Sequence, residues 1–452
     1  MSDTHPWVPD VTSSACSNVP VPVGGEGAMT SMRSQRSGAT RGHIVWVNQF
    51  AIPPSHPGGT RHYDLALTLK DLGWDVEIVA SDLSLTTRTY WHRSSRYDPR
   101  VARDVVDGVA FTYVWAGSYK RNDWRRMLSM ILFGASVAVL LAFRRSERRT
   151  VFIGSSPHLF AAFGTWLAAV VRRRVFVLEV RDLWPESYAE VSGGGENSIP
   201  YRLMRRMADV LYRRADAIIV LAEGNRDRII SRGADPSKIS YIPNGVNFQE
   251  FAEPTGKVPS SERPVRFIYT GAHGPANGLD VVVQACAVLQ RDGAGDIEVV
   301  FVGDGPAKDE LASMARRLGL RNLELRDAVP KSEMPEVLAS SDIGLMVLAQ
   351  VELFSYGVSP NKLFDYLAAN LPVLTNVPGL VADIVRSADA GCACDAGNPE
   401  ALAAAMRTMA EEIRADPARF RNGRAYVQRH FDRQLLAGQV DALVRGVLAA
   451  EH

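Results

Sequence analysis

The distribution of apolar residues divides the chain into short strand-like runs and longer helical segments. From residue 43 onward, runs such as 43–50, 150–156 and 175–180 are nearly continuous in Val, Ile, Leu and Phe, as strands buried on both faces of a parallel sheet are. Helix-length segments such as 60–72 and 198–214 separate these runs. The alternation predicts a doubly wound α/β domain, with further strands at 74–81, 109–116 and 217–223.

The same pattern begins again after a polar stretch that ends near Arg263. This second series predicts helices alternating with strands at 265–271, 297–303, 323–329, 343–349 and 372–377. Residues 242–246, Ile-Pro-Asn-Gly-Val, and the polar stretch behind them predict the hinge between two Rossmann-like domains. Open α/β folds of this kind bind ligands at the carboxyl ends of their strands, so we expect a site between the two sheets.

The sequence therefore predicts four segments. Residues 1–41 are rich in Pro, Ser, Gly and Thr and show no apolar period, which predicts a disordered leader. They lack the charged and apolar regions of a secretory signal. Residues 42–245 are predicted to form the first Rossmann-like domain and residues 246–423 the second, while residues 424–452 form a helix that crosses back to the first.

Composition places few further limits on function. The chain has 452 residues, of which 46% are apolar and 22% are charged, and a net charge of +1. These values describe an ordinary globular protein and give no reason to expect a nucleic-acid partner. Its four cysteines are too few for a disulfide framework. Because Cys392 and Cys394 lack a second pair of Cys or His nearby, we interpret them as core thiols in a reducing cytoplasm and predict no metal site.

Two glycine-containing turns are candidates for contact with a phosphate. Residues 58–61, Gly-Gly-Thr-Arg, open a helix after the first strand. Backbone N–H groups and the helix N-terminus favour an anion there and Arg61 adds a charge, although a merely tight turn is the alternative. Residues 303–306, Gly-Asp-Gly-Pro, lack the third glycine of a dinucleotide-binding fingerprint. The sequence therefore disfavours a nicotinamide-dependent dehydrogenase.

The strongest local signal is the stretch 355–369, Ser-Tyr-Gly-Val-Ser-Pro-Asn-Lys-Leu-Phe-Asp-Tyr-Leu-Ala-Ala. A polar loop leads into a helix, with Lys362 in the first turn and Asp365 on the same face one turn later. The loop amides and Lys362 suit a diphosphate, and Asp365 suits the hydroxyl groups of a ribose. The alternative is a helix that begins at Pro360 and carries ordinary surface charges.

Taken together, these motifs resemble those of retaining GT-B glycosyltransferases of family 4. Besides 355–369, the resemblance lies in Tyr-Thr-Gly at 269–271, Val-Gly-Asp-Gly-Pro at 302–306 and Ile-Pro-Asn-Gly-Val at 242–246. Residues 181–187, Arg-Asp-Leu-Trp-Pro-Glu-Ser, are most similar to the bacterial O-antigen and capsule N-acetylfucosaminyl transferases. The resemblance extends from about residue 43 to the C-terminus.

The resemblance implies a two-domain GT-B fold and a role for each matching residue. Catalysis would involve Arg181 and Asp182. The donor would bind at Gly58, Gly59, Arg61, Gly271, Asn277, Gly303, Ser359, Asn361, Lys362 and Asp365. Retention of anomeric configuration without a metal ion or cofactor is implied as well, and the sequence contains no Asp-x-Asp cluster to hold a metal ion on a diphosphate.

Three departures from the family pattern bear on the site. Many relatives carry two glutamates eight positions apart, whereas here Gly357 stands at the first position and Asp365 at the second. Residues 272–278 lack the Arg and Lys that many relatives use to bind the diphosphate. A His-Asp pair of relatives is Arg181-Asp182 here, and capping of a helix is the alternative role for Asp182.

Residues 127–143 form a long apolar run with arginine pairs directly before and after it. The run is at the lower limit for a membrane-spanning helix, which needs about 20 apolar residues, and it interrupts an α/β domain. A core or half-exposed helix is therefore favoured. Because further arginines make this domain locally basic, we predict docking on an anionic membrane surface through Leu132, Phe133, Val137 and Leu140. A nucleic-acid patch is the competing interpretation, but it lacks interleaved aromatic residues.

The sequence thus predicts a cytoplasmic enzyme that is peripheral on the inner face of the cell membrane. It would transfer a sugar from a nucleotide sugar to a lipid-linked or polysaccharide acceptor in cell-envelope glycan synthesis. A UDP-linked donor is favoured, with N-acetylated amino sugars among the candidates. A sugar-nucleotide epimerase of the same fold is one alternative. A catalytically inactive nucleotide-binding scaffold is the other, because Gly357 and Asn277 stand where relatives have charged residues.

Overall fold

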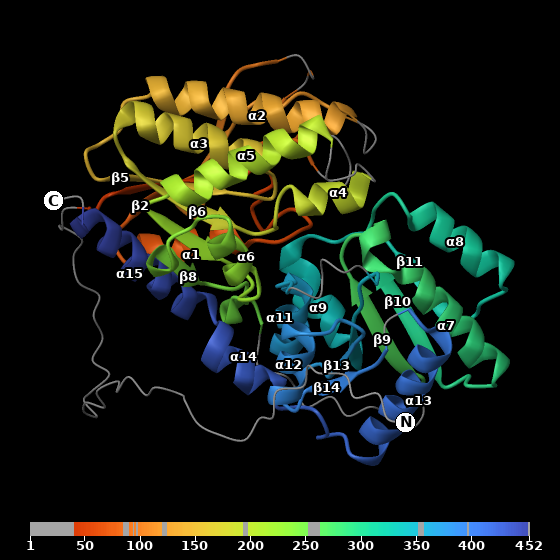
Figure 1. The fold of residues 1–452 in the computed structure, drawn as a ribbon. Helices are drawn as coiled ribbons and strands as arrows, with labels where there is room; N and C mark the ends of the chain where they lie inside the picture. The colour runs from red at the N-terminus through yellow and green to blue at the C-terminus, as the bar shows by residue number, and fades with distance from the viewer. Residues whose placement is uncertain are drawn as a thin grey trace, which may run out of the picture. The chain divides into compact units, whose positions relative to one another are not determined.

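The computed structural model describes most of the chain from residue 40 onward (Figure 1). The described residues are 40–84, 90–93, 95, 98–119, 124–192, 198–251, 263–350, 357–395 and 397–450. The predicted leader therefore lies outside the described residues except for its last two positions, and so do Ser355 and Tyr356 of the 355–369 stretch.

The first sheet has eight strands in the order β3-β4-β2-β1-β5-β6-β7-β8. Their bounds are β1 His43–Val47, β2 Asp75–Ala80, β3 Ala102–Val106, β4 Val109–Tyr113, β5 Thr150–Ser155, β6 Val175–Val180, β7 Ala217–Val220 and β8 Ile239–Tyr241. All neighbours are parallel except β3 and β4, which are antiparallel. The chain order reverses at β1, which lies between β2 and β5, so the ends of β1 and β5 form a switch point of the doubly wound type.

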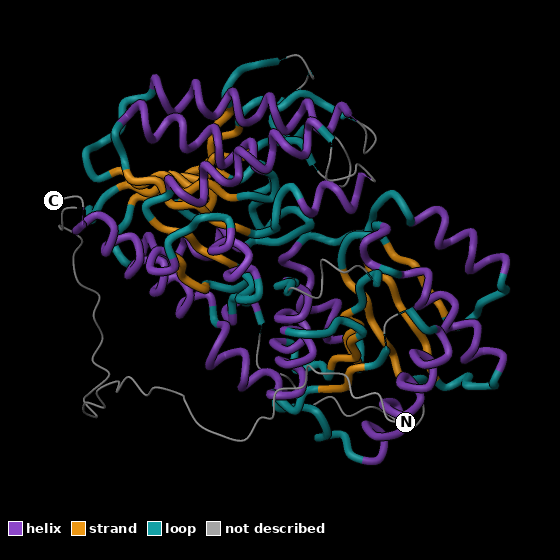
Figure 2. Tube along the Cα trace, viewed as in Figure 1, coloured by secondary structure: helices purple, strands orange, loops and turns teal. Residues whose placement is uncertain are grey.

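Helices cover both faces of this sheet (Figures 1 and 2). They are α1 Arg61–Asp71, α2 Trp124–Phe143, α3 Leu159–Arg172, α4 Glu186–Ser192, α5 Ile199–Arg214, α6 Asn225–Ser231 and the C-terminal α15 Arg433–Ala450. One apolar cluster joins alternate strand residues to α2, α3, α5 and α6, and the other joins the remaining strand residues to α1 and α15. The continuous apolar runs of the sequence are therefore strands buried on both sides.

The second sheet has six parallel strands in the order β11-β10-β9-β12-β13-β14. Their bounds are β9 Val265–Thr270, β10 Ile297–Val302, β11 Leu323–Arg326, β12 Ile343–Met346, β13 Val373–Thr375 and β14 Gly391–Ala393. Its helices are α7 Leu279–Arg291, α8 Lys308–Arg317, α9 Met334–Ala339, α11 Asn361–Ala368, α12 Leu380–Ser387, α13 Pro399–Ala415 and α14 Gly423–Phe431. Here too an apolar cluster lies on each face of the sheet.

The prediction of two Rossmann-like domains with a C-terminal helix that crosses back is confirmed for α15. The predicted single helix over residues 424–452 is wrong, because α14 is a separate helix that packs on the second domain. Leu436, Val440 and Val444 of α15 pack into the core of the first domain, beside Leu65 and Leu69 of α1. Three short edge strands, β3, β8 and β14, were not expected from the sequence. Each has three to five residues, too few for a clear apolar period.

Close backbone contact between α2 and α3 fixes which side of α2 faces the core. A Cβ atom on Gly164 would lie 2.1 Å from the carbonyl oxygen of Gly134, and one on Gly134 would lie 2.4 Å from the carbonyl oxygen of Phe160. Only glycine lets the two helices approach this closely. Phe133 and Val137 consequently point into the core and are fully buried.

The predicted membrane contact through Phe133 and Val137 is therefore wrong. Leu132 and Leu140 are half-buried, and Leu140 packs against the same core. The opposite side of α2 is exposed instead, at Trp124, Leu128, Ile131, Val139 and Phe143. By length and composition, α2 is the one helix of the described chain that could cross a membrane, and a third of its most apolar window is buried.

Candidate functional site

Lys362 lies in the first turn of α11 and provides the clearest functional geometry. Its Nζ is 3.8 Å from the centroid of the Tyr269 ring and 3.5 Å from Oδ1 of Asn277. Burial lowers the pKa of the Lys362 ammonium to about 7. No carboxylate in the described part of the chain forms an ion pair with it. A half-buried lysine without an anionic partner is costly for the protein alone and is suited to an anionic ligand.

The ends of β9 and β10 surround this lysine with closely spaced backbone. A Cβ atom on Gly271 would lie 3.4 Å from Cε of Lys362, and one on Gly303 would lie 1.8 Å from the carbonyl oxygen of Gly271. The structure thus brings Gly271, Asn277 and Lys362 together. It gives Gly303 a packing role, because any side chain there would separate the two strand ends.

Asp365 follows one turn later on α11 and is only 6% exposed. Its Oδ1 accepts a hydrogen bond from Nζ of Lys331 at 2.6 Å. Lys331 opens the short 3-10 helix Lys331–Glu333 behind β11 and is buried as well. This partner was not found from the sequence, because nothing in the local pattern joins two charges that are 34 residues apart.

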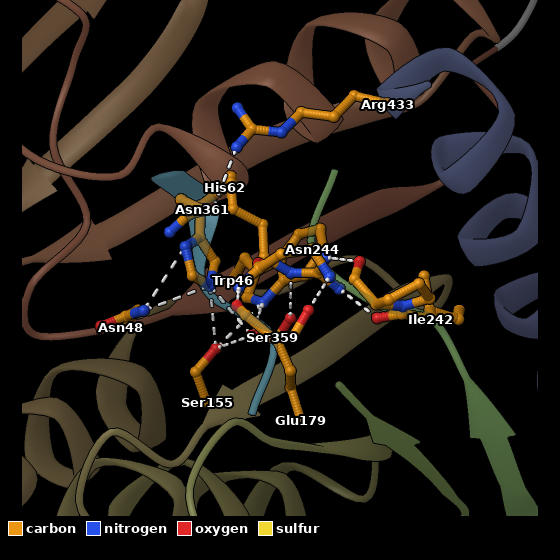
Figure 3. A network of polar contacts seen from close by, with 12 residues as sticks. Trp46, Asn48, His62, Ser155, Glu179, Ile242, Asn244, Ser359, Asn361 and Arg433 are labelled. Carbon is orange, nitrogen blue, oxygen red and sulfur yellow. Dashed lines mark hydrogen bonds and ion pairs between the residues drawn. The ribbon is translucent and has the colours of Figure 1, made fainter. Parts of the chain in front are cut away.

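Ser359 and Asn361, predicted donor ligands, use their side chains to bind other parts of the protein (Figure 3). The backbone N–H of Asn244 donates to Oγ of Ser359 at 3.0 Å, and the Asn244 side chain donates to the Ser359 carbonyl. Arg433 donates to Oδ1 of Asn361 at 3.3 Å, and a Cβ atom on Gly59 would lie 2.7 Å from Nδ2 of Asn361. Ser359 and Asn361 therefore hold the loop before α11 against the segment 242–246 and the start of α15, rather than standing free for a ligand.

Arg433 is a buried cation at the start of α15 that the sequence interpretation missed. It donates to Oγ1 of Thr60 at 3.0 Å and forms an ion pair with Asp64 on α1. Burial lowers the pKa of Arg433 to about 9, with the charge of Arg61 adding to the effect. Because the same side chain also reaches Asn361, it links the crossover helix, α1 and α11 (Figure 3).

The prediction that Arg61 binds a phosphate is wrong. Its side chain is 1% exposed, and its Nε donates to Oε1 of Glu179 at 2.9 Å. The two remaining nitrogens donate to the carbonyl oxygens of Ile242 and Pro243. Every nitrogen of the guanidinium is thus engaged within the protein. Gly58 and Gly59 position this helix start, but they do not present Arg61 to a ligand.

Glu179 of β6 is the centre of this buried network (Figure 3). Besides Arg61, it accepts hydrogen bonds from His62 at 2.9 Å, from Trp46 at 3.4 Å and from Ser155. Burial alone would raise the pKa of Glu179, but His62 and Arg61 hold it well below its usual value. The network therefore contains an ionised carboxylate that stabilises the fold around the hinge segment 242–243.

Arg181 and Asp182 follow β6, at the carboxyl end of an interior strand of the first sheet. Solvent reaches the Asp182 side chain, yet the surrounding protein desolvates its carboxyl and raises its pKa, with Arg181 opposing the shift. A raised pKa on an accessible carboxyl is typical of groups that handle protons. The capping alternative is not supported, because α4 begins four residues later at Glu186. Within the described residues, neither side chain forms a hydrogen bond to Lys362 or Asp365.

The described residues contain no group of three or more His, Cys, Asp or Glu side chains arranged to hold a metal ion. The three described cysteines are free thiols: Cys286 is buried, and Cys392 and Cys394 are half-buried. Burial raises the pKa of each thiol, to about 12 for Cys286 and to about 11 for Cys394. The arrangement therefore favours anion binding at Lys362 over metal or thiolate chemistry among these residues.

Two doubly wound sheets that follow one another in the chain are the architecture of the GT-B class of proteins. Comparison with known proteins agrees with this class. Residues 58–245 match the Glycosyl transferase 4-like domain, and residues 264–412 match the Glycosyl transferases group 1 domain. The chain therefore carries the two domains of a GT-B glycosyltransferase.

Individual relatives are distant. WbjE of Pseudomonas aeruginosa, described as a probable glycosyltransferase, is 26% identical over 313 residues, which cover 68% of this chain and 76% of WbjE. WcaL of Salmonella typhimurium, described as a putative colanic acid biosynthesis glycosyltransferase, is 24% identical over 243 residues. This match covers 52% of this chain and 58% of WcaL. The solved structure of HepE from Anabaena with UDP and glucose has a TM-score of 0.64 at 15% identity, covering 90% of this chain and 100% of HepE. At such identities the structural match establishes the fold alone.

Proposed function

We propose that this protein transfers a glycosyl group from a nucleotide sugar to a lipid-linked or polysaccharide acceptor in cell-envelope glycan synthesis. UDP-linked sugars are the proposed donors, with N-acetylated amino sugars of the fucosamine type among them. The observation that carries the proposal is the half-buried Lys362 in the first turn of α11, which forms an ion pair with no carboxylate of the described residues. The names of WbjE and WcaL support the reaction class, and the UDP complex of HepE supports the nucleotide.

In the proposed reaction, the bond between the sugar and the diphosphate breaks while the acceptor hydroxyl attacks the same face and passes its proton to the departing diphosphate oxygen, so that configuration is retained. Negative charge then develops on the leaving diphosphate, and Lys362 with the first-turn amides of α11 stabilises it. Because the groups are fixed before the reaction, they need little reorganisation in the transition state. Asp365 binds the ribose hydroxyls, and Asp182 is the proposed acceptor-facing carboxylate.

The donor class can be tested by thermal unfolding in the presence of UDP-, GDP- and ADP-sugars. A ligand that binds only the native state raises the unfolding temperature by mass action. We expect UDP-sugars to raise it most and to compete with UDP. Failure of every nucleotide sugar to stabilise the protein at millimolar concentration would contradict the proposed function.

Transfer should not depend on a divalent cation. We expect activity to survive an excess of EDTA, because Lys362 and helix amides supply the positive charge that a metal ion supplies elsewhere. The measurement is the initial rate of sugar transfer with EDTA alone and with EDTA plus magnesium or manganese. Complete loss of activity with EDTA, restored by either metal, would overturn this part of the mechanism.

We further propose that the protein is peripheral on the cytoplasmic face of the cell membrane. Ten of the fourteen large apolar side chains exposed in the described chain lie on three neighbouring helices. They are Trp124, Leu128, Ile131, Val139 and Phe143 of α2, Leu167, Val170 and Val171 of α3, and Ile199 and Leu203 of α5. In Figure 1 these helices lie side by side on one face of the first sheet. We call this set the exposed apolar face.

Exposed arginines accompany the exposed apolar face on α5 and in the turns that follow α2 and α3. They are Arg145, Arg148, Arg149, Arg173, Arg202, Arg205, Arg206, Arg213 and Arg214. Cations beside exposed apolar surface match an anionic membrane, where each contributes about 1 kcal/mol near the surface. Such docking would bring the acceptor domain to a glycan whose lipid cannot leave the bilayer.

Vesicle flotation tests this localisation. Replacing Leu128, Val139 and Phe143 by serine should abolish flotation with anionic vesicles, because these side chains are exposed and their loss leaves the core intact. The matched control replaces Leu318 and Leu435, which are exposed elsewhere on the protein. Binding should fall with salt and require anionic lipid. Flotation that is equal for the wild type, the triple variant and the control would reject the surface.

A further inference from the structure

Lys331 is the buried partner of Asp365, the proposed ligand of the donor ribose. The Lys331 side chain is 5% exposed, and its Nζ lies 2.6 Å from Oδ1 of Asp365. The backbone around it is fixed too, since the N–H groups of Lys331 and Ser332 donate to the carbonyl oxygens of His56 and Pro54 in the first domain. Both ends of this lysine are therefore held in place.

A buried ion pair of this kind is not explained by stability alone. Desolvation of two charges often cancels their attraction, so that an apolar pair of similar volume is as stable or more stable. A second carboxylate, Glu250, lies close to the same lysine. Glu250 is close enough for Lys331 and Asp365 to affect its pKa, which burial raises, but its Oε2 has no hydrogen-bond partner among the described residues. The lysine is directed at Asp365.

The two oxygens of Asp365 are in different situations. Oδ1 is engaged by Lys331, whereas Oδ2 accepts no hydrogen bond from the described residues and is not among the side-chain atoms buried without a partner. Oδ2 is thus the oxygen that the described residues leave without a hydrogen bond. Aspartate has only two side-chain torsions, so engaging one oxygen fixes the direction of the other.

We propose that Lys331 is a positioning residue for the ribose of the donor, which it serves by holding Oδ1 of Asp365 and leaving Oδ2 for the ribose hydroxyls. This inference rests on the proposed function, in which the donor is a nucleotide sugar. Lys331 does not touch the reacting atoms. Its effect is confined to recognition of the ribose, and the diphosphate contacts of Lys362 are independent of it.

The test compares UDP with 2′,3′-dideoxy-UDP, which lacks the ribose hydroxyls, by calorimetry. The wild type should bind UDP about tenfold or more tightly than the dideoxy nucleotide, as expected for hydrogen bonds to a carboxylate. In Lys331→Met this ratio should fall to within about threefold of unity, with the affinity for the dideoxy nucleotide unchanged. Lys331→Arg should restore part of the ratio, and Asp365→Asn should lower it as Lys331→Met does.

Lys308→Met is the matched control, because Lys308 forms a different ion pair, with the exposed Asp327. It should keep the wild-type ratio. An unchanged ratio in folded Lys331→Met would overturn the proposal, and so would an equal loss of affinity for both nucleotides, which indicates a structural role only. If the wild type binds neither nucleotide, the proposed function itself fails, and that outcome is distinct from either of these.

Discussion

Replacement of Lys362 by methionine should weaken the binding of a UDP-sugar by about 10- to 100-fold and reduce transfer further. The expected loss corresponds to a hydrogen bond to a charged group, about 1.5–3 kcal/mol. Transfer should fall by about another 100-fold, because charge on the leaving diphosphate is greatest in the transition state. Affinity is measured by calorimetry, and the rate by release of UDP from the donor.

The pH dependence of binding gives this prediction a second readout. The pKa of free Lys362 is about 7 because the side chain is desolvated. Below that pH the Lys362 ammonium is charged and attracts the diphosphate. As the pH rises through 7, Lys362 of the free protein loses its proton, and it must take up a proton again in order to bind the diphosphate. The diphosphate of a UDP-sugar does not titrate in this range, so affinity should fall with rising pH by up to about tenfold per unit.

Lys362→Arg separates this cause from other titrations. An arginine stays protonated throughout the range, so its affinity should be flat between pH 7 and 9, whatever its absolute value. A wild-type profile that is flat, or a methionine variant that binds UDP-sugar as tightly as the wild type, would exclude Lys362 as the phosphate ligand.

Replacement of Arg61 by methionine should destabilise the first domain without acting on the donor directly. Breaking a buried ion pair by removing one partner costs about 3–5 kcal/mol, because the other charge stays buried. Here the carbonyl oxygens of Ile242 and Pro243 lose their donors as well. For a domain of this size we expect the unfolding temperature to fall by about 6–20 °C.

Calorimetric unfolding measures this effect, and Arg386→Met is the control. Arg386 forms an exposed pair with Asp383 on α12, and exposed pairs contribute at most about 1 kcal/mol. The double variant Arg61→Met with Glu179→Gln should lose less stability than the two single variants added together, since the uncompensated charge is gone. An Arg61→Met protein with unchanged unfolding temperature but weakened UDP binding would restore the phosphate role that the structure contradicts.

The sequence was sufficient for the fold because its strands carry unusually clear signals. Runs such as Val175–Val180 are apolar at every position but one, as buried parallel strands require. The single exception is Glu179. This carboxylate pairs with Arg61, which is why Arg61 is not available to bind a phosphate as the sequence predicted. A charge inside such a run indicates a buried partner, but the partner lies 118 residues away in the chain. The local sequence pattern cannot identify a partner that is so distant in the chain.

The candidate site was predictable where it depends on helix spacing and unpredictable where it depends on tertiary contact. Lys362 and Asp365 share a face of α11 because they are three positions apart, which the sequence already contains. Lys331 and Arg433 reach α11 from other elements and left no local signal. The side of α2 that faces the core could not be predicted either, because the helix is apolar on nearly all sides. Its orientation is set by the close contact of Gly134 with α3.

Transfer of labelled sugar to lipid tests the central claim most directly. Purified protein is incubated with radiolabelled UDP-sugars and bacterial membranes that contain lipid-linked glycans, and the label extracted into organic solvent is counted for the wild type and for Lys362→Met. We predict that at least one UDP-sugar labels the lipid fraction with the wild type, in the presence of EDTA, and that Lys362→Met reduces the label by at least about 100-fold. Equal labelling by the two proteins, or no labelling by a folded protein that binds none of the nucleotide sugars, would contradict the account.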